Sequence, residues 1–493
     1  MTFVSLADEL RELGRIAPSR IAISCNGRDV TYGDLWEHVE RATQTLSRTL
    51  AVKSGDRVAY LGLNDPAQIV LLVALMRLGA ILVPLNYRLA QAELQSTLDD
   101  AGAGLVVADL EHADAAACFG IRCVGRDSLF DEASTATVDE VPGSPERPAL
   151  LVYTSGTTGK PKGAVHTQGT LYANALASHA FHHFDVRDIV LTVLPLFHVG
   201  GLCIQTLPAL YAGLRVILHP RFDPGAWLHC VATERATIAL MIPTTMSAVQ
   251  AHPQWGETDL SSLRLLAAGS SSIALRLIGR FHARRIPVCQ IYGATETGPV
   301  SIVLDADDAY QHVGATGKPA LGTSVMLVDA YGAPVSDDGV GEILISGPNV
   351  VASYWRDGDD SAFVDGWFRT GDLAVRDREG FYIVVGRSKD LIISGGENIY
   401  PVEIENVLVE LDGIAEAAVV GLPDPRWGEV PVAAIVPHHD AMPDEATIRA
   451  ALDAKLARFK HPRRIVFRAT LPRNALGKVQ KSVLIEELTQ SSD

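Results

Sequence analysis

The chain has 493 residues, and a single hydrophobic core stops growing at roughly 250–300 residues, so two or more domains are expected. Hydrophobic residues make up 47% of the sequence and charged residues 20%, which is typical of a globular protein. The net charge of −16 argues against a general binder of nucleic acids or anionic membranes. An anionic ligand would therefore need a local cluster of cations.

The amino-terminal segment and the cysteines indicate a cytoplasmic protein. Acidic residues stand where a signal peptide needs basic ones. The most apolar run, residues 69–83, contains Arg77 and Gly79 and falls short of the ~20 residues of a transmembrane span, so we expect a buried helix and a buried strand there. The cysteines show neither a C-x-x-C pair nor metal-site spacing, and buried reduced thiols are expected. They are Cys25, Cys118, Cys123, Cys203, Cys230 and Cys289.

Short apolar runs alternate with helical stretches over the first third of the chain. The pattern predicts strands over 57–62, 80–84 and 104–108, and helices over 67–78 and 91–101. This alternation favours a parallel sheet covered by helices on both faces. Residues 134–147 are polar and contain two prolines, which suggests a boundary, and a second alternating region runs from about 151 to 298.

The last third of the sequence changes character twice. Short strands separated by glycine and aspartate, at 324–328 and 341–346 for example, predict a small β-rich subdomain over 317–385. Beyond residue 386 a compact domain of ~100 residues is expected, hinged near Lys389. Its predicted helices are 401–411, 446–459 and 478–489, and its predicted strands are 414–420, 430–436 and 464–467.

A loop rich in glycine, hydroxyl and lysine residues, 153–163, can hold a polyphosphate. Its glycines let the backbone approach an anion, its hydroxyls donate hydrogen bonds, and its lysines add positive charge. The residues concerned are Thr154, Ser155, Gly156, Thr157, Thr158, Gly159, Lys160 and Lys162. The common P-loop needs four residues between its glycines, whereas two separate Gly156 from Gly159.

Further segments carry chemistry-bearing residues along the rest of the chain. His198 follows Pro-Leu-Phe and lies beside Gly200 and Gly201, and taken alone it is better interpreted as a core histidine than as a functional one. The remaining segments are 268–271 (AGSS), 290–298 (QIYGATETG), 366–372 (GWFRTGD), 386–390 (GRSKD), 392–405 (IISGGENIYPVEIE) and 471–478 (LPRNALGK).

In their order and approximate spacing these segments resemble the adenylate-forming superfamily, the acyl-CoA synthetases, over nearly the whole chain. The resemblance implies an α/β fold like that of acetyl-CoA synthetase. Residues 1–387 would form a large AMP-binding domain of two α/β subdomains and a small β-rich subdomain. Residues 388–493 would form a small mobile α+β domain.

The resemblance also implies roles at the nucleotide site. Glu296, with Thr154, would bind Mg²⁺, for which oxygen ligands are suited. Tyr292 would stack on adenine and Thr295 would bond the α-phosphate. Asp372 and Arg387 would contact the ribose. Nearby positions expected at the nucleotide and acyl pockets are Gly269, Ser270, Ser271, Gln290, Ile291, Gly293 and Ala294; residues 268–271 depart from the family's usual Gly-Gly-Ala-Pro form.

The small domain would supply the catalytic Lys478 to the first half-reaction and then turn about Lys389. Gly395 and Gly396 would meet the pantetheine arm of coenzyme A after this rotation. Trp427 and Arg88 align with contacts to coenzyme A in some relatives.

The implied activity is an ATP-dependent carboxylate–CoA ligase with ATP, Mg²⁺ and coenzyme A as cofactors. A carboxylate attacks the α-phosphate to give acyl-AMP and pyrophosphate, and the CoA thiol then displaces AMP. Ile291, with the apolar Val199, Leu202, Val300 and Ile302 expected nearby, favours an acid with an uncharged acyl tail: a medium-chain fatty, aromatic or alicyclic acid.

Two other functions stay open at this point: an acyl-AMP ligase that loads a carrier protein, and a catalytically silent acyl-nucleotide-binding protein. The second expects loss of Glu296, Asp372 or Lys478, and all three are present. His198 joins the catalytic candidates by the same resemblance. A homodimer is an assembly that the sequence leaves open.

Overall fold

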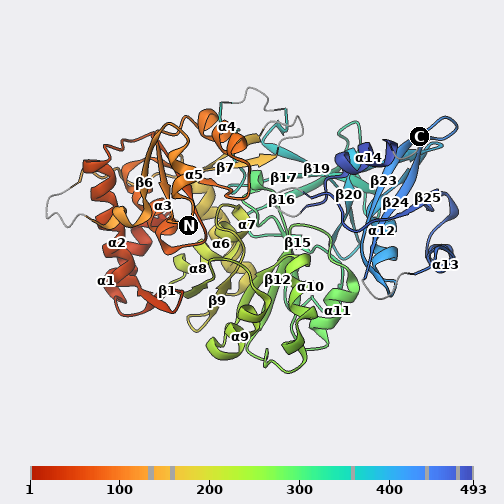
Figure 1. Ribbon diagram of the computed structural model, residues 1–493, viewed down its shortest axis with the longest axis horizontal. Coiled ribbons are helices and arrows are strands. Elements are labelled where there is room, and N and C mark those ends of the chain that lie inside the picture. The colour runs from red at the N-terminus through yellow and green to blue at the C-terminus, as the bar shows by residue number, and fades with distance from the viewer. Residues whose placement is uncertain are drawn as a thin grey trace.

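The computed structural model describes residues 3–131, 138–155, 161–356, 361–438, 443–473 and 478–490, which form four β-sheets (Figure 1). Two large sheets and a small antiparallel sheet occupy the left and centre of the view. The elements that follow residue 391 stand apart at its right-hand end. The phosphate-loop residues Gly156, Thr157, Thr158, Gly159 and Lys160 lie outside the described residues.

The first large sheet has six strands in the order β6-β5-β3-β4-β7-β8. All neighbours are parallel except the edge pair formed by β7 and β8. The strands are β3 (Arg57–Leu61), β4 (Ile81–Leu85), β5 (Leu105–Ala108), β6 (Arg122–Gly125), β7 (Pro148–Ser155) and β8 (Pro161–Thr167). The predicted strands and helices of residues 57–108 are confirmed, with ends shifted by one residue at most places.

The second large sheet has nine strands in the order β15-β14-β13-β12-β11-β9-β10-β1-β2. Its central strands are parallel, as expected for a sheet covered by helices. The strands are β1 (Ile21–Cys25), β2 (Arg28–Thr31), β9 (Ile189–Thr192), β10 (Arg215–Leu218), β11 (Ile238–Met241), β12 (Leu265–Gly269), β13 (Val288–Tyr292), β14 (Ile302–Val303) and β15 (Lys318–Pro319).

The two large sheets do not follow the two alternating regions of the sequence. β1 and β2 precede the first region but pair in the second sheet, beside β10. β7 and β8 begin the second region but close the edge of the first sheet. Strand order depends on long-range pairing, which a local pattern of apolar residues does not encode.

The helices of this part of the chain begin and end at ordinary capping signals. Asp65 caps α3 by accepting a hydrogen bond from the Ala67 N–H, Pro66 starts it, and Gly79 ends it at φ 69°. The helices are α1 (Leu6–Ile16), α2 (Tyr32–Gln44), α3 (Pro66–Leu78), α4 (Gln91–Ala101), α5 (Ala113–Ala117), α6 (Gln168–His182), α7 (Val199–Gly201), α8 (Leu207–Tyr211), α9 (Pro224–Glu234), α10 (Pro243–Ala251) and α11 (Leu275–His282).

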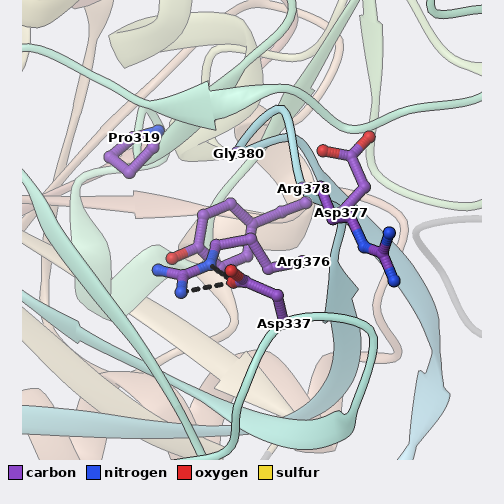
Figure 2. Close-up of a pocket in the computed structure, with 7 residues that line it drawn as sticks. Pro319, Asp337, Arg376, Asp377, Arg378 and Gly380 are labelled. Atoms are coloured by element: carbon purple, nitrogen blue, oxygen red, sulfur yellow. Dashed lines mark hydrogen bonds and ion pairs between the residues drawn. The ribbon is translucent and has the colours of Figure 1, made fainter.

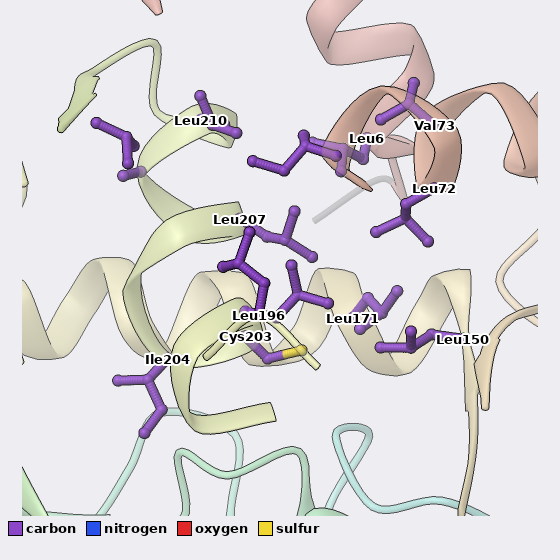
Figure 3. Close-up of a cluster of buried hydrophobic side chains, with 14 of the residues drawn as sticks. Leu6, Leu72, Val73, Leu150, Leu171, Leu196, Cys203, Ile204, Leu207 and Leu210 are labelled. Atoms are coloured by element: carbon purple, nitrogen blue, oxygen red, sulfur yellow. The ribbon is translucent and has the colours of Figure 1, made fainter. Parts of the chain in front are cut away.

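The main core joins the two large sheets through α3, α6 and α8. Residues 67–78 of α3 are all buried, which confirms the buried helix expected in the most apolar run. Figure 3 shows Leu72, Leu150, Leu171 and Leu207 of different elements packed into one cluster. This shared core fixes the two sheets relative to each other, so residues at their facing edges can form one site.

Along the sequence, the small antiparallel sheet precedes residue 388 and the C-terminal sheet follows it. The small sheet comprises β16 (Ser324–Val328), β17 (Val340–Ser346), β18 (Phe363–Val364), β19 (Trp367–Arg376) and β20 (Tyr382–Arg387). The C-terminal sheet comprises β21 (Ile392–Ser394), β22 (Glu397–Ile399), β23 (Ile414–Asp424), β24 (Gly428–Pro437) and β25 (Arg464–Phe467). A single 3₁₀ turn, Ser388–Asp390, connects the two sheets.

Helices cover both faces of the C-terminal sheet. α12 (Pro401–Val409) and α13 (Glu445–Lys455) pack on one face, and α14 (Lys481–Gln490) packs on the other. The predicted helix 446–459 is shorter than expected, because a separate 3₁₀ turn occupies Arg458–Lys460. An ion pair at 3.4 Å joins Arg276 of α11 to Asp412, which follows α12.

The cysteines form no disulfide, but the expectation that all are buried is wrong. Cys118 is exposed and Cys123 is partly exposed, since both lie near the outer strand β6 of the first sheet. The other four are buried. Within the described part of the chain, no helix is both long enough and apolar enough to span a bilayer.

Candidate active site

The phosphate loop connects the two strands of an antiparallel hairpin. Ser155 at the end of β7 pairs with Pro161 at the start of β8, and Thr154 pairs with Lys162. Thr154 and Lys162 are therefore neighbours on adjacent strands, at the base of the loop. A hairpin can hold the ends of such a loop at a fixed separation, whereas a P-loop leads directly into a helix.

The predicted second nucleotide segment, residues 290–298, turns sharply after β13. A Cβ at Gly293 would lie 2.3 Å from the Pro299 carbonyl oxygen, so only glycine fits at this turn. The chain then enters a 3₁₀ turn, Thr295–Thr297, in which Glu296 is 8% exposed. The turn therefore presents a largely buried carboxylate.

Successive residues of β13 face opposite sides of the sheet. Ile291 is 4% exposed and belongs to the main core together with Val199, Leu202 and Val300. The expectation that Ile302 lies with them is wrong. Ile302 pairs with Tyr292 rather than with Ile291, so its side chain lies on the other face, in the core of the small sheet.

Asp372 and Arg387 meet across the small sheet. They are partners in the register of β19 and β20, and Arg387 Nε lies 3.0 Å from Asp372 Oδ1. The Tyr292 hydroxyl donates to Asp372 Oδ2 at 2.8 Å. Burial, and next the charge of Asp372, raise the pKa of Tyr292 well above its usual value, so the phenol stays a donor. The structure thus brings together the proposed adenine and ribose contacts.

His198 caps the short helix α7. Its Nδ1 accepts a hydrogen bond from the Gly200 N–H at 3.0 Å, so the neutral ring carries its proton on Nε2. A Cβ at Gly201 would lie 2.2 Å from the Pro195 carbonyl oxygen, so the turn requires glycine there. Burial, with the nearby charge of Lys478, lowers the pKa of His198 to about 4. The histidine is therefore neutral at physiological pH.

Lys478 reaches this site from the C-terminal part of the chain. Burial is the largest cause that lowers its pKa, and the charge of Arg387 also lowers it. The negative charges of Asp372 and Glu296 act in the opposite direction. Side chains from β19, β20 and the turn Thr295–Thr297 therefore act on one lysine, and the two carboxylates oppose the lowering of its pKa.

Gly395 and Trp427 form a separate cluster on the C-terminal sheet. The Gly395 N–H donates to the Trp427 carbonyl oxygen at 2.8 Å, and a Cβ at Gly395 would lie 2.7 Å from the indole ring. The guanidinium groups of Arg426 and Arg463 lie 4.9 Å and 5.8 Å from the indole centroid. This cluster supplies an aromatic surface beside two cations.

The remaining predicted ligand contacts differ in their exposure and in the groups that they already contact. Ser270 and Ser271 are exposed, and Ser270 adopts the left-handed region at φ 76°. Gln290 uses its side-chain amide to bond the Ala315 carbonyl oxygen at 2.7 Å, which is a structural role. The guanidinium carbon of Arg88 lies 5.9 Å from the centroid of the Phe197 ring. Phe197 immediately precedes His198, so Arg88 is near the predicted acid pocket.

A carboxylate for a metal is present at Glu296, and the donor set around it suits Mg²⁺. In the described residues no group of three or more His, Cys, Asp and Glu side chains could hold a metal. Mg²⁺ commonly uses only one or two carboxylates, with substrate phosphates and water as the other ligands. The largely buried Glu296, beside the phosphate hairpin formed by β7 and β8, fits that pattern.

Sequence reasoning missed Tyr354. Its hydroxyl donates to Glu296 Oε1 at 2.7 Å, although 58 residues separate the two positions. No periodicity or spacing in the sequence connects them.

The surface also carries hollows outside this site. One of about 230 Å³ lies at the small sheet, where Arg376 pairs with Asp337 at 2.5 Å (Figure 2). Another of about 390 Å³ lies around Arg20 and Arg187. The residues that line these two hollows include none of the described candidate site residues.

Family models match the two parts of the chain. The model of the AMP-binding enzymes matches residues 10–355, and that of the AMP-binding enzyme C-terminal domain matches residues 403–478. The indoleacetate–CoA ligase of Aromatoleum aromaticum is 43% identical over 483 residues, covering 94% of each chain. A feruloyl-CoA synthase of Amycolatopsis is 41% identical over 472 residues, covering 95% of this chain and 96% of its own.

A solved structure supports the same assignment. O-succinylbenzoate coenzyme A synthetase from Bacillus subtilis, in complex with ATP and magnesium ion, superposes with a TM-score of 0.88. It is 32% identical, and the match covers 98% of this chain and 99% of that one. The chain therefore belongs to the adenylate-forming acyl-CoA synthetase family of AMP-binding enzymes.

Proposed function

We propose that this enzyme activates an aromatic monocarboxylic acid whose remaining part is uncharged, an arylacetic or arylacrylic acid. It then transfers the acyl group to coenzyme A. The relatives named for indoleacetate and ferulate are 43% and 41% identical, whereas those named for long-chain fatty acids and for 2-succinylbenzoate are 32% to 36% identical. The observation that carries the proposal is the burial of Ile291 in one apolar cluster with Val199, Leu202 and Val300. A second carboxylate there would be a buried charge costing several kcal/mol.

The chain's own residues have distinct roles in the first half-reaction. Mg²⁺, when bound by Glu296 with Thr154, would neutralise phosphate charge and polarise the phosphoryl oxygens. His198 donates from Nε2 to the acid and orients it. The carboxylate oxygen then attacks the α-phosphorus while the bond to pyrophosphate breaks. Lys478 stabilises the negative charge that develops between the two anions.

In the second half-reaction the thiol of coenzyme A loses its proton to solvent as its sulfur attacks the acyl carbonyl, and AMP leaves with the electrons of its bond to the acyl carbon. We assign Asp372 and Arg387 to the ribose, which holds AMP in place throughout. We propose that residues 388–493 turn about Lys389 between the two steps, which would withdraw Lys478 and bring Gly395 and Trp427 to the acyl-adenylate.

The free thiols suit a reducing compartment, and we infer a cytoplasmic enzyme.

A panel of acids tests the substrate class. Pyrophosphate release is measured with indoleacetate, ferulate, phenylacetate, octanoate, 2-succinylbenzoate and malonate. We expect kcat/KM for the aryl monoacids to exceed that for octanoate by about tenfold or more, and the dicarboxylates to react more slowly still. A preference for octanoate or for a dicarboxylate would contradict the proposed acid while leaving the ligase activity intact.

A further inference from the structure

Residues 349–355, here called the bridging segment, run from the second nucleotide segment to the phosphate hairpin. At its first end, the Asn349 side-chain amide donates to the Thr297 carbonyl oxygen at 2.6 Å. The Val351 N–H donates to the carbonyl oxygen of Glu296 at 2.8 Å. The bridging segment therefore holds the backbone of the turn that carries Glu296.

At its other end the bridging segment pairs with β8. Tyr354 forms an antiparallel bridge with Ala164, and the Trp355 N–H donates to the Gly163 carbonyl oxygen at 2.7 Å. The indole N–H of Trp355 also donates to the Asp100 carbonyl oxygen at 3.3 Å, near the end of α4. The segment is thus anchored on both sides of the proposed metal and phosphate site.

Tyr354 makes the side-chain link between these two ends. Its hydroxyl donates to Glu296 Oε1 at 2.7 Å, and the Lys162 ammonium lies 5.0 Å from its ring centroid. The edge of Phe363 packs against the same ring at 5.4 Å, which limits its rotation. One side chain therefore contacts a carboxylate through its hydroxyl and an ammonium through its ring.

We propose that Tyr354 is a positioning residue that orients Glu296 for the metal and Lys162 for the phosphates. The hydroxyl occupies Oε1 and so fixes the rotation of the carboxylate, which leaves Oε2 to bind the ion. A hydrogen bond to a ligating carboxylate typically changes metal affinity or activity by 10–100-fold. The cation–π contact keeps the Lys162 ammonium over the ring. This inference rests on the proposed role of Glu296.

The test separates the hydroxyl from the ring. Tyr354→Phe removes the hydrogen bond and keeps the ring, and Tyr354→Leu removes both. Each variant is loaded with the α,β-methylene analogue of ATP and titrated with Mn²⁺, and free Mn²⁺ is measured by electron paramagnetic resonance. We expect Tyr354→Phe to bind Mn²⁺ about 10–100-fold more weakly than the wild type.

Nucleotide binding in EDTA provides the second readout. Tyr354→Phe should bind the analogue as the wild type does, because Lys162 keeps its ring contact. Tyr354→Leu should bind it more weakly. Tyr382→Phe is the matched control, since it deletes a hydroxyl that donates to the Val325 carbonyl oxygen at 3.2 Å in the small sheet. It should change neither measurement.

The Glu296→Gln variant distinguishes a failure of the role proposed for Tyr354 from a failure of the metal assignment at Glu296. If Glu296→Gln weakens Mn²⁺ binding and Tyr354→Phe binds Mn²⁺ as the wild type does, the positioning role of Tyr354 is overturned. If Glu296→Gln also binds Mn²⁺ normally, the metal assignment itself fails. Melting temperatures of Tyr354→Phe and Tyr382→Phe that agree with each other would show that weaker metal binding is no consequence of unfolding.

Discussion

The pKa of Lys478 depends on burial and on three charged groups around it. Burial and the charge of Arg387 lower its pKa, while the negative charges of Asp372 and Glu296 oppose this lowering. We assign those carboxylates to the proposed nucleotide site. In the proposed domain rotation, Lys478 would lose both its counter-charges and its buried surroundings.

Replacement of Lys478 by alanine should separate the two half-reactions. Removal of one donor that stabilises developing charge typically costs about 10²–10³ in rate, so acyl-AMP formation from acid and ATP should fall by that factor. Thioester formation from pre-made acyl-AMP and coenzyme A should stay near the wild-type rate. Stopped-flow measurement of each half-reaction checks this, with Lys481→Ala, three residues away, as the control. Equal slowing of both steps would contradict the proposed alternation.

At the scale of single elements, the 3₁₀ turn Ser388–Asp390 is the short covalent connection between the small sheet and the C-terminal sheet. β20 ends in the small sheet at Arg387, and β21 begins in the C-terminal sheet at Ile392. A large rotation of one sheet against the other needs changes in φ and ψ at these few residues.

Proline at position 389 should hinder this rotation. Lys389→Pro fixes φ at that residue and restricts Ser388 before it, whereas Lys389→Ala removes the same side chain and leaves the backbone free. We expect Lys389→Pro to form acyl-AMP at nearly the wild-type rate and to form thioester roughly tenfold or more slowly. Lys389→Ala should perform both steps normally. Loss of thioester formation in both variants would assign the effect to the side chain instead.

The sequence predicted most elements because their signals are local. The ends of α4 and β25 were predicted to the residue, since a capping glycine or a short apolar run marks them. The partners of each strand were not predicted. Ile302 was expected beside Ile291, but the register of β14 against β13 places it with Tyr292 on the other face. A shift of one residue in register exchanges the two faces, and nothing local specifies it.

At the scale of the whole molecule, buried histidines couple stability to pH. His182 is fully buried, and its ring stacks on Phe184 with centroids 4.9 Å apart. Burial lowers its pKa to about 3. The unfolded chain, with a histidine pKa of about 6.5, binds more protons below that pH than the folded chain does. Stability is therefore lost as the pH falls below about 6.5.

His182→Phe should reduce this loss. By pH 5 one such histidine lowers the free energy of unfolding by roughly 2 kcal/mol relative to neutral pH, and phenylalanine cannot be protonated. Urea unfolding at pH 7.5 and pH 5.0 measures the difference for each variant. His229→Gln, which changes an exposed histidine, is the control and should leave the pH dependence as in the wild type. An unchanged pH dependence in His182→Phe would show that protonation of His182 does not cause the loss of stability.

The sequence predicted those residues of the candidate site that lie within contiguous motifs. Glu296, Asp372, Arg387 and Lys478 each have a sequence motif around them, and the structure gathers all four. Tyr354 was missed because its significance comes only from the fold, which places it between the turn at Glu296 and β8. Motifs record which residues share a segment, whereas the contacts that orient those residues come from tertiary packing.

The ion pair between Arg276 and Asp412 has a consequence for how the enzyme responds to its ligands. Both side chains are exposed, at 36% and 105%, so the pair contributes at most about 1 kcal/mol. A ligand that binds one domain orientation tenfold better than another shifts their populations by about 1.4 kcal/mol. In the proposed domain rotation, even a modest ligand preference would outweigh the pair, and this contact would then act as a weak latch that bound ligands release.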